Sequence, residues 1–189
     1  MSSTQMLVLL VVVAVSVIVA VGLLAKRKRR SRMLRERFGP EYDRVVKKEG
    51  DVQKGERVLD FRQKHREKLH IRPLSPDDRE SFAGQWRDAQ AQFVDDPKGA
   101  VTLADGLVID AMQARGYPIT DFEQQAADLS VDHPVVVENY RSAHEIALRH
   151  GRGQASTEDL RKAMVHYRAL FEDLLGETGE AVQPRRREA

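Results

Sequence analysis

The chain is 189 residues long and carries 31 Lys and Arg against 29 Asp and Glu, a formal net charge of +2. A composition of 41% hydrophobic and 32% charged residues excludes a chain that is disordered throughout and a protein with many membrane spans. The chain has no cysteine, which excludes disulfides, thiolate metal ligands and a cysteine nucleophile.

The charges are unevenly distributed along the chain. Residues 1–25 carry none, residues 26–70 hold 17 Lys and Arg against 8 Asp and Glu, and residues 71–189 hold 14 against 21. The near-neutral total therefore hides an uncharged start, a basic middle and an acidic remainder.

The uncharged start contains a run typical of a membrane span. Residues 6–25 read MLVLLVVVAVSVIVAVGLLA, interrupted only by Ser16 and Gly22. Twenty helical residues at about 1.5 Å each span about 30 Å, the thickness of the hydrocarbon layer. We expect a transmembrane helix here, after a short external N-terminus at residues 1–5. A buried core helix is disfavoured because it needs no charge-free run of this length.

A cleaved signal peptide, and with it export of the protein, is the stronger alternative. Against it, the run is longer than a usual signal h-region, and residues 2–5 carry no positive charge. Six of the next seven residues are basic, and the positive-inside rule places them in the cytoplasm, with the N-terminus outside and the C-terminus inside. These residues are Lys26, Arg27, Lys28, Arg29, Arg30 and Arg32.

The same basic residues are expected to contact the bilayer through its anionic headgroups. Nucleic-acid binding is disfavoured because the cluster lacks interleaved aromatic residues; the next aromatic side chains are Phe38 and Tyr42. The sequence therefore predicts lipid and no nucleic acid as a partner of this segment.

Residues 26–70 are expected to form a charged, helical juxtamembrane arm or stalk. Two helices are expected, at about 40–48 and 51–69, with Pro40 in a first helical turn. The apolar residues are too sparse for a full core face, and they do not sustain the heptads of a homodimeric coiled coil.

Residues 71–176 are expected to form a compact bundle of about five helices. Ser75 and Pro76 start the first, whose stripe of Phe82, Trp86, Ala89 and Phe93 ends before Asp95. The second runs over about 98–115 and stops at Gly116.

Three more helices follow within this bundle. Thr120, with Glu123 as a capping box, opens one that ends near Leu129. Asp132 caps a fourth helix from His133 to His150. Ser156 with Asp159, or Thr157 as an alternative, caps a fifth that ends at Gly176. No segment alternates with period two, so the fold class is all-α. Residues 177–189 read as a disordered basic tail.

Metal and cofactor sites are not expected. Among six histidines only Glu67–His70 has the Glu-x-x-His spacing of a carboxylate-bridged metal bundle, and that pattern needs two such pairs. No glycine-rich phosphate loop occurs either.

One group of polar residues is a candidate acid/base site. Glu138 and Arg141 are i,i+3 neighbours, and His144 follows on the same expected helix, with Asp132 at its start. A helix cap with an ordinary salt-bridged face explains the same residues, and we favour that interpretation. An enzyme is therefore the less favoured hypothesis.

Aromatic residues have two interpretations as well. Trp86, Tyr140 and Tyr167 either fill the core, which we favour, or form an exposed patch that binds a protein partner.

Several segments together resemble an uncharacterised family of bacterial single-span membrane proteins with a cytosolic helical domain. They are residues 37–43, 71–76, 121–124, 128–134 and 164–168, so that the resemblance covers most of the chain. It implies a location in the bacterial cytoplasmic (inner) membrane, and it brings no activity, cofactor or catalytic residue.

Three functions are open. The first is a membrane-tethered helical module that binds another protein. The second is a small enzyme or ligand-binding bundle with a site near Glu138, Arg141 and His144, and the third is an envelope protein that forms homo-oligomers.

Overall fold

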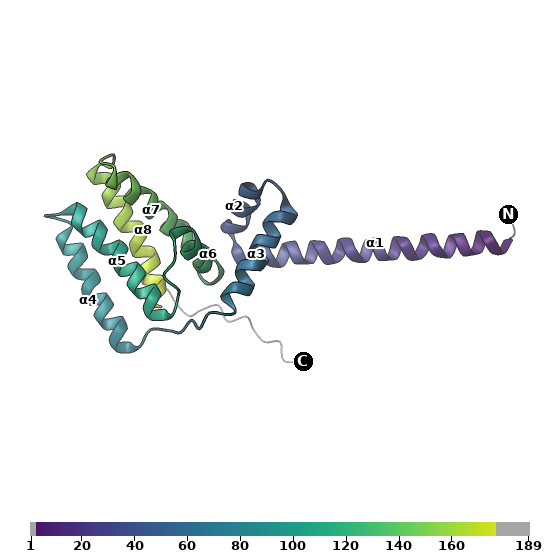
Figure 1. Ribbon diagram of the computed structural model, residues 1–189, viewed down its shortest axis with the longest axis horizontal. Helices are drawn as coiled ribbons and strands as arrows, with labels where there is room; N and C mark the ends of the chain where they lie inside the picture. Colours follow the sequence, from purple (N-terminus) through teal and green to yellow (C-terminus); the bar gives the residue numbers. More distant parts are fainter. Residues whose placement is uncertain (1–2, 177–189) are drawn as a thin grey trace. The chain divides into compact units, whose positions relative to one another are not determined.

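The computed structural model describes residues 3–176 and, within the first helix, the side chains of Leu10, Val13 and all residues from Ser16 onward. This part of the chain forms eight helices and no strand, which confirms the all-α fold (Figure 1). The expected tail at 177–189 lies outside the described residues. The helices are α1 Ser3–Phe38, α2 Pro40–Glu49, α3 Val52–Arg66, α4 Pro76–Gln92, α5 Pro97–Arg115, α6 Phe122–Asp132, α7 Val137–Gly151 and α8 Thr157–Leu175.

The chain divides into two compact units, residues 1–59 and 60–189. The boundary falls within α3, about ten residues before the one expected at residue 70. The first unit holds α1, α2 and the beginning of α3, and the second holds the end of α3 and helices α4–α8.

The first unit is folded rather than extended. α1 runs unbroken from Ser3 to Phe38, and α2 begins at Pro40 after Gly39, whose φ is 49°. Five apolar side chains are buried although the segment is poor in such residues, because three different helices supply them; they are Leu34, Phe38, Tyr42, Val45 and Leu59. A count along any one helix face misses this arrangement.

The predicted membrane span is not among the structural findings. Within the part of the chain whose side chains are described, no helix is both long and apolar enough to cross a membrane. The expected span at 6–25 includes side chains outside that part, namely those of residues 6–9, 11, 12, 14 and 15. The span therefore stays a prediction.

Local capping determines where most helices of the second unit begin. The Ser75 hydroxyl accepts a hydrogen bond from the Asp78 amide at the start of α4. Ser156 and Asp159 form a reciprocal capping box at the start of α8, and Gly176 ends that helix in the left-handed conformation. These three boundaries agree with the sequence-based expectation.

Two expected caps are wrong. α6 is capped by Asp121, which accepts a hydrogen bond from the Gln124 amide, and not by Thr120. Asp132 is the last residue of α6 rather than the cap of α7, which begins only at Val137 and has no side-chain cap. Pro134 explains the later start, because proline disfavours the helical conformation of the residue before it.

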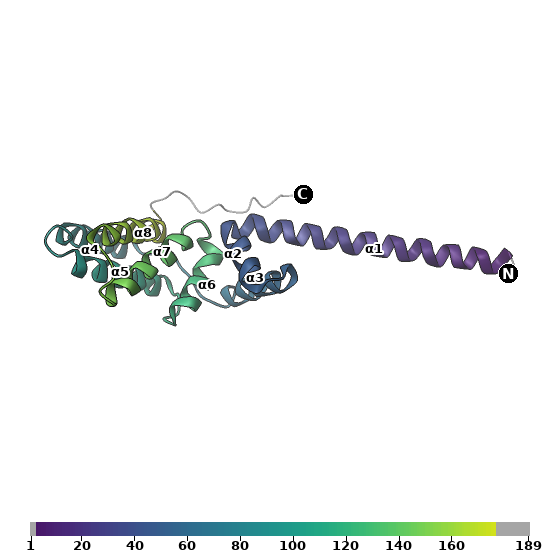
Figure 2. The ribbon, with the colours of Figure 1, turned by 90° about the horizontal axis from the view of Figure 1, so that it is seen from above.

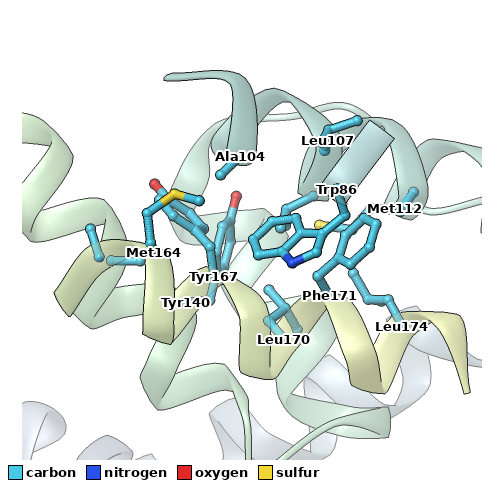
Figure 3. Packing of buried hydrophobic residues seen from close by; sticks show 14 of the residues in the cluster. Trp86, Ala104, Leu107, Met112, Tyr140, Met164, Tyr167, Leu170, Phe171 and Leu174 are labelled. Atoms are coloured by element: carbon cyan, nitrogen blue, oxygen red, sulfur yellow. The ribbon is translucent and has the colours of Figure 1, made fainter. Parts of the chain in front are cut away.

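The core of the second unit forms mainly where α8 packs against α5 and α7, and where α4 packs on α5. The ring of Trp86 on α4 stacks on Phe171 of α8, with centroids 4.6 Å apart and planes inclined by 21° (Figure 3). Figure 3 also shows Tyr140 and Tyr167 together beside Met164. These large aromatic side chains are part of a core that consists otherwise mainly of aliphatic residues.

Candidate functional site

The six basic residues that follow the apolar run lie on the exposed surface of α1. Arg32 pairs with Glu36 one turn further along, at 2.7 Å between Nε and Oε1. Both side chains are more than half exposed, and such surface pairs contribute little to stability. The cluster therefore offers a dense positive charge to water or to a charged partner.

The polar candidates on α7 have different environments. Glu138 is exposed, Arg141 is buried and His144 is half-buried. Arg141 pairs with Glu123 of α6, with 3.8 Å between Nη1 and Oε1, and no Glu138–Arg141 pair within 4 Å is found among the described residues. The i,i+3 spacing is thus present without the ion pair that it suggested.

His144 packs against an aromatic ring of α6. Its imidazole stacks on Phe122, with centroids 3.6 Å apart and planes inclined by 7°. Burial lowers the pKa of His144, while the negative charges of Asp105 and Glu123 act in the opposite direction. The environment favours a neutral imidazole near pH 7.

Asp132 belongs to a different set of contacts. Its carboxylate accepts a hydrogen bond from the Tyr117 hydroxyl at 2.8 Å and pairs with Arg66 of α3. Burial, together with the Asp132 charge, raises the pKa of Tyr117, so that this hydroxyl stays protonated as the donor. Arg141, His144 and Asp132 therefore contact separate partners, and these contacts do not join the four candidates in one site.

A second polar network lies next to Asp132 in the sequence and was not foreseen. His133 contacts the Asp173 carboxylate of α8 through Nδ1, and its Nε2 lies 3.4 Å from Nη1 of Arg115. The same Arg115 nitrogen donates to the backbone carbonyl of Leu174 at 3.0 Å. These contacts hold the ends of α5, α6 and α8 together.

The α6 helix also carries a buried carboxylate. Asp128 accepts a hydrogen bond from Gln124 at 2.8 Å, and His65 Nε2 lies 3.7 Å from it. Burial raises the pKa of Asp128, partly offset by Gln124, His65 and Arg62. Arg62 donates to the Ser130 hydroxyl of α6 at 3.1 Å. Several polar contacts thus join residues 62–66 of α3 to α6.

These long-range networks have no sequence signal. The partners in the pairs His133–Asp173 and Arg66–Asp132 are separated by 40 and 66 residues. Spacing rules for helices reach only one or two turns, so such pairs become visible only in the fold.

The three aromatic residues considered for partner binding are core residues instead. Trp86, Tyr140 and Tyr167 have exposed fractions of 6%, 1% and 0%. The Tyr140 hydroxyl donates to Gln125 at 2.8 Å, inside the protein. Burial and the charge of Asp105 raise the pKa of both tyrosines. None of the three rings is available to a partner.

The surface between α4 and α5 has an open groove. Its lining combines polar side chains such as Gln85 and Asp110 with Gly106 and Leu107. No group of three or more His, Asp or Glu side chains that could hold a metal ion occurs in the described part of the chain.

Comparison with family models, with curated proteins and with solved structures gives no match for this chain. The resemblance to bacterial single-span membrane proteins therefore stays a prediction.

Proposed function

We propose that this protein is a membrane-anchored helical module that binds a protein partner at the cytoplasmic face of a bacterial inner membrane. One observation carries the anchor. The charge-free run at residues 6–25 is part of the same unbroken helix as the buried residues Leu34 and Phe38 of the first unit. Because one continuous helix contains both parts, a membrane span at 6–25 would fix the distance of the buried residues from the membrane.

The exposed side chains of α1 support the anchor. Val17, Ile18, Val19 and Val21 are all more than half exposed and occupy different faces of the helix. A helix that is apolar all round is stable when lipid or protein covers it. The basic cluster at 26–32 supports a cytoplasmic position for the units that follow.

A binding role is favoured over catalysis by the contacts of the polar candidates. Arg141, His144 and Asp132 are engaged by Glu123, Phe122 and Tyr117 within the fold. Such contacts serve the packing of helices. Tethering raises the effective concentration of the acidic second unit for partners at the membrane surface, and a basic partner surface would complement its charge.

Alkaline carbonate extraction of native membranes tests the anchor. The wild-type chain is expected to remain in the membrane pellet, because extraction removes peripheral proteins only. A double substitution Val17→Lys and Ile18→Lys places two charges in the middle of the run and is expected to release the chain. The control, Lys64→Val and Lys68→Val, changes two exposed residues of the second unit and should leave the chain in the pellet. Release of the wild-type chain would contradict the anchor.

Crosslinking of the full-length protein in its native membrane, followed by mass spectrometry, tests the binding role. Crosslinks from the second unit to one other protein are the expected result. Crosslinks only between copies of this chain would favour the oligomeric envelope protein, and crosslinks to no protein at all would contradict an interaction module.

A further inference from the structure

The chain of the first unit folds back on α1. The Glu56 carboxylate of α3 accepts hydrogen bonds from Ser31 of α1 and from the Tyr42 hydroxyl of α2, the latter at 2.9 Å. A Cβ on Gly55 would lie 2.9 Å from the Cα of Val46, so that α2 and α3 cross in close contact. The beginning of α3 is thereby held beside Ser31 rather than beyond the end of α1.

This folding brings one turn close to the predicted membrane surface. Ser31 follows Ala25, the last residue of the apolar run, by six positions, which is about 9 Å along a helix. In both views the turn between α2 and α3 extends back along α1 toward its N-terminal part (Figures 1 and 2). The headgroup layer on each side of a bilayer is about 5–8 Å thick, so the turn lies at the level of the headgroups or just outside it.

The turn has the chemistry of a surface that contacts anionic lipid. Lys47, Lys48 and Lys54 are exposed, and Val52 at the start of α3 is 49% exposed. Two acidic residues, Glu49 and Asp51, lie among them. Asp51 uses one carboxylate oxygen to accept a hydrogen bond from the Lys54 amide at 2.8 Å.

The three lysines exceed the two exposed acidic residues of the turn by one charge, and other basic residues of the first unit add to this. Glu56, two residues after Lys54, is buried by its contacts with Ser31 and Tyr42 and so adds no exposed negative charge. Arg57, which follows Glu56 on α3, is exposed. The basic cluster at 26–32 lies on the adjoining part of α1. Each basic residue close to an anionic leaflet contributes about 1 kcal/mol of attraction.

We propose that the α2–α3 turn, residues 47–54, is a second contact of this protein with anionic phospholipid headgroups. The contact rests on the proposed anchor, and it fixes the orientation of the first unit against the membrane. Val52 enters the headgroup layer while the three lysines bind lipid phosphates.

Fluorescence quenching of a single label by an uncharged quencher tests this contact. Because the chain has no cysteine, the full-length Val52→Cys variant can be labelled with a single fluorophore at residue 52. The labelled protein is reconstituted in nanodiscs of phosphatidylcholine with or without phosphatidylglycerol. Acrylamide quenching is expected to fall severalfold when phosphatidylglycerol is present, and to recover in high salt. A label at Arg37→Cys, about 18 Å past Ala25 along α1, should be quenched equally in both lipids.

Two triple variants distinguish the effect of the lysines in the turn from an effect of the protein's net charge. Lys47→Gln, Lys48→Gln and Lys54→Gln together are expected to abolish the shielding of the label at residue 52. The control removes three exposed lysines of the second unit, Lys64, Lys68 and Lys98, and should preserve the shielding.

The possible outcomes are distinguishable. Loss of the wild-type protein from the nanodiscs would contradict both the anchor and the contact. Stable incorporation with equal quenching in the two lipids would contradict the contact alone. Loss of shielding in both triple variants would also contradict it, because the effect would then come from net charge.

Discussion

His144 illustrates how burial changes the chemistry of a single side chain in this protein. Its ring lies parallel to Phe122 and is half-buried, and this burial lowers its pKa below the ordinary value of 6.5. Protonation would place a positive charge in an environment that solvates it poorly. The sequence made this residue a candidate member of an acid/base site, and in the fold its ring packs on Phe122.

We therefore predict that His144 titrates below pH 6.5 in the folded protein. In this range the unfolded chain binds the proton more readily than the folded chain. The contribution of His144 to the free energy of unfolding is consequently present above pH 6.5 and is lost as the pH falls through the folded pKa. NMR titration of the histidine resonances, assigned with His144→Gln, measures this directly, and a midpoint above 6.5 would contradict the burial argument.

Helix crossings depend on small residues where two backbones approach. At the contact of α2 and α3, Gly55 is buried and a Cβ there would meet both Cα and Cγ2 of Val46 at 2.9 Å. Gly106 on α5 is the opposite case, because a Cβ at this position meets nothing within 4 Å. The two glycines thus predict opposite effects of the same substitution.

Gly55→Ala is expected to destabilise the protein by about 1–3 kcal/mol, the usual cost of overpacking. Gly106→Ala is expected to stabilise it by about 0.5–1 kcal/mol, because alanine loses less conformational entropy in a helix. Chemical denaturation of the full-length protein in detergent, followed by circular dichroism, measures both. An unchanged or raised stability of Gly55→Ala would show that α2 and α3 do not cross as described.

The contact of α4 with α8 predicts a larger effect. Trp86 stacks on Phe171 and is almost fully buried. Trp86→Ala should cost about 3–5 kcal/mol, because it removes a large apolar surface and leaves a cavity. Phe61→Ala is the control, since Phe61 is 67% exposed. Thermal unfolding of the two variants compares them, and equal midpoints would argue against this core.

The helices differ in how well the sequence predicts them. The starts of α4 and α8 are predictable because a serine and a residue three positions later form the cap. The start of α7 is not, since the chain leaves the helix at His133 before Pro134 and re-enters it without a side-chain cap. The buried residues of the first unit are also missed, because Leu34, Tyr42 and Leu59 lie on three different helices.

In the complete molecule, charge and hydropathy change in order along the first unit, which includes α1, and into the second unit. The apolar run, the basic cluster and the first buried residues are consecutive parts of α1, so their order is fixed by a single helix. The acidic second unit follows after residue 60. This order predicts that the N-terminus and the second unit are on opposite sides of a membrane.

Thiol labelling of two single-cysteine variants measures this orientation most directly. Ser3→Cys lies before the apolar run, and Gln154→Cys lies on the exposed turn between α7 and α8, where it leaves the Ser156 cap intact. In intact spheroplasts an impermeant maleimide is expected to label residue 3 alone, and residue 154 only after the membrane is permeabilised. Labelling of Gln154→Cys in intact spheroplasts would contradict a cytoplasmic second unit and favour an exported protein.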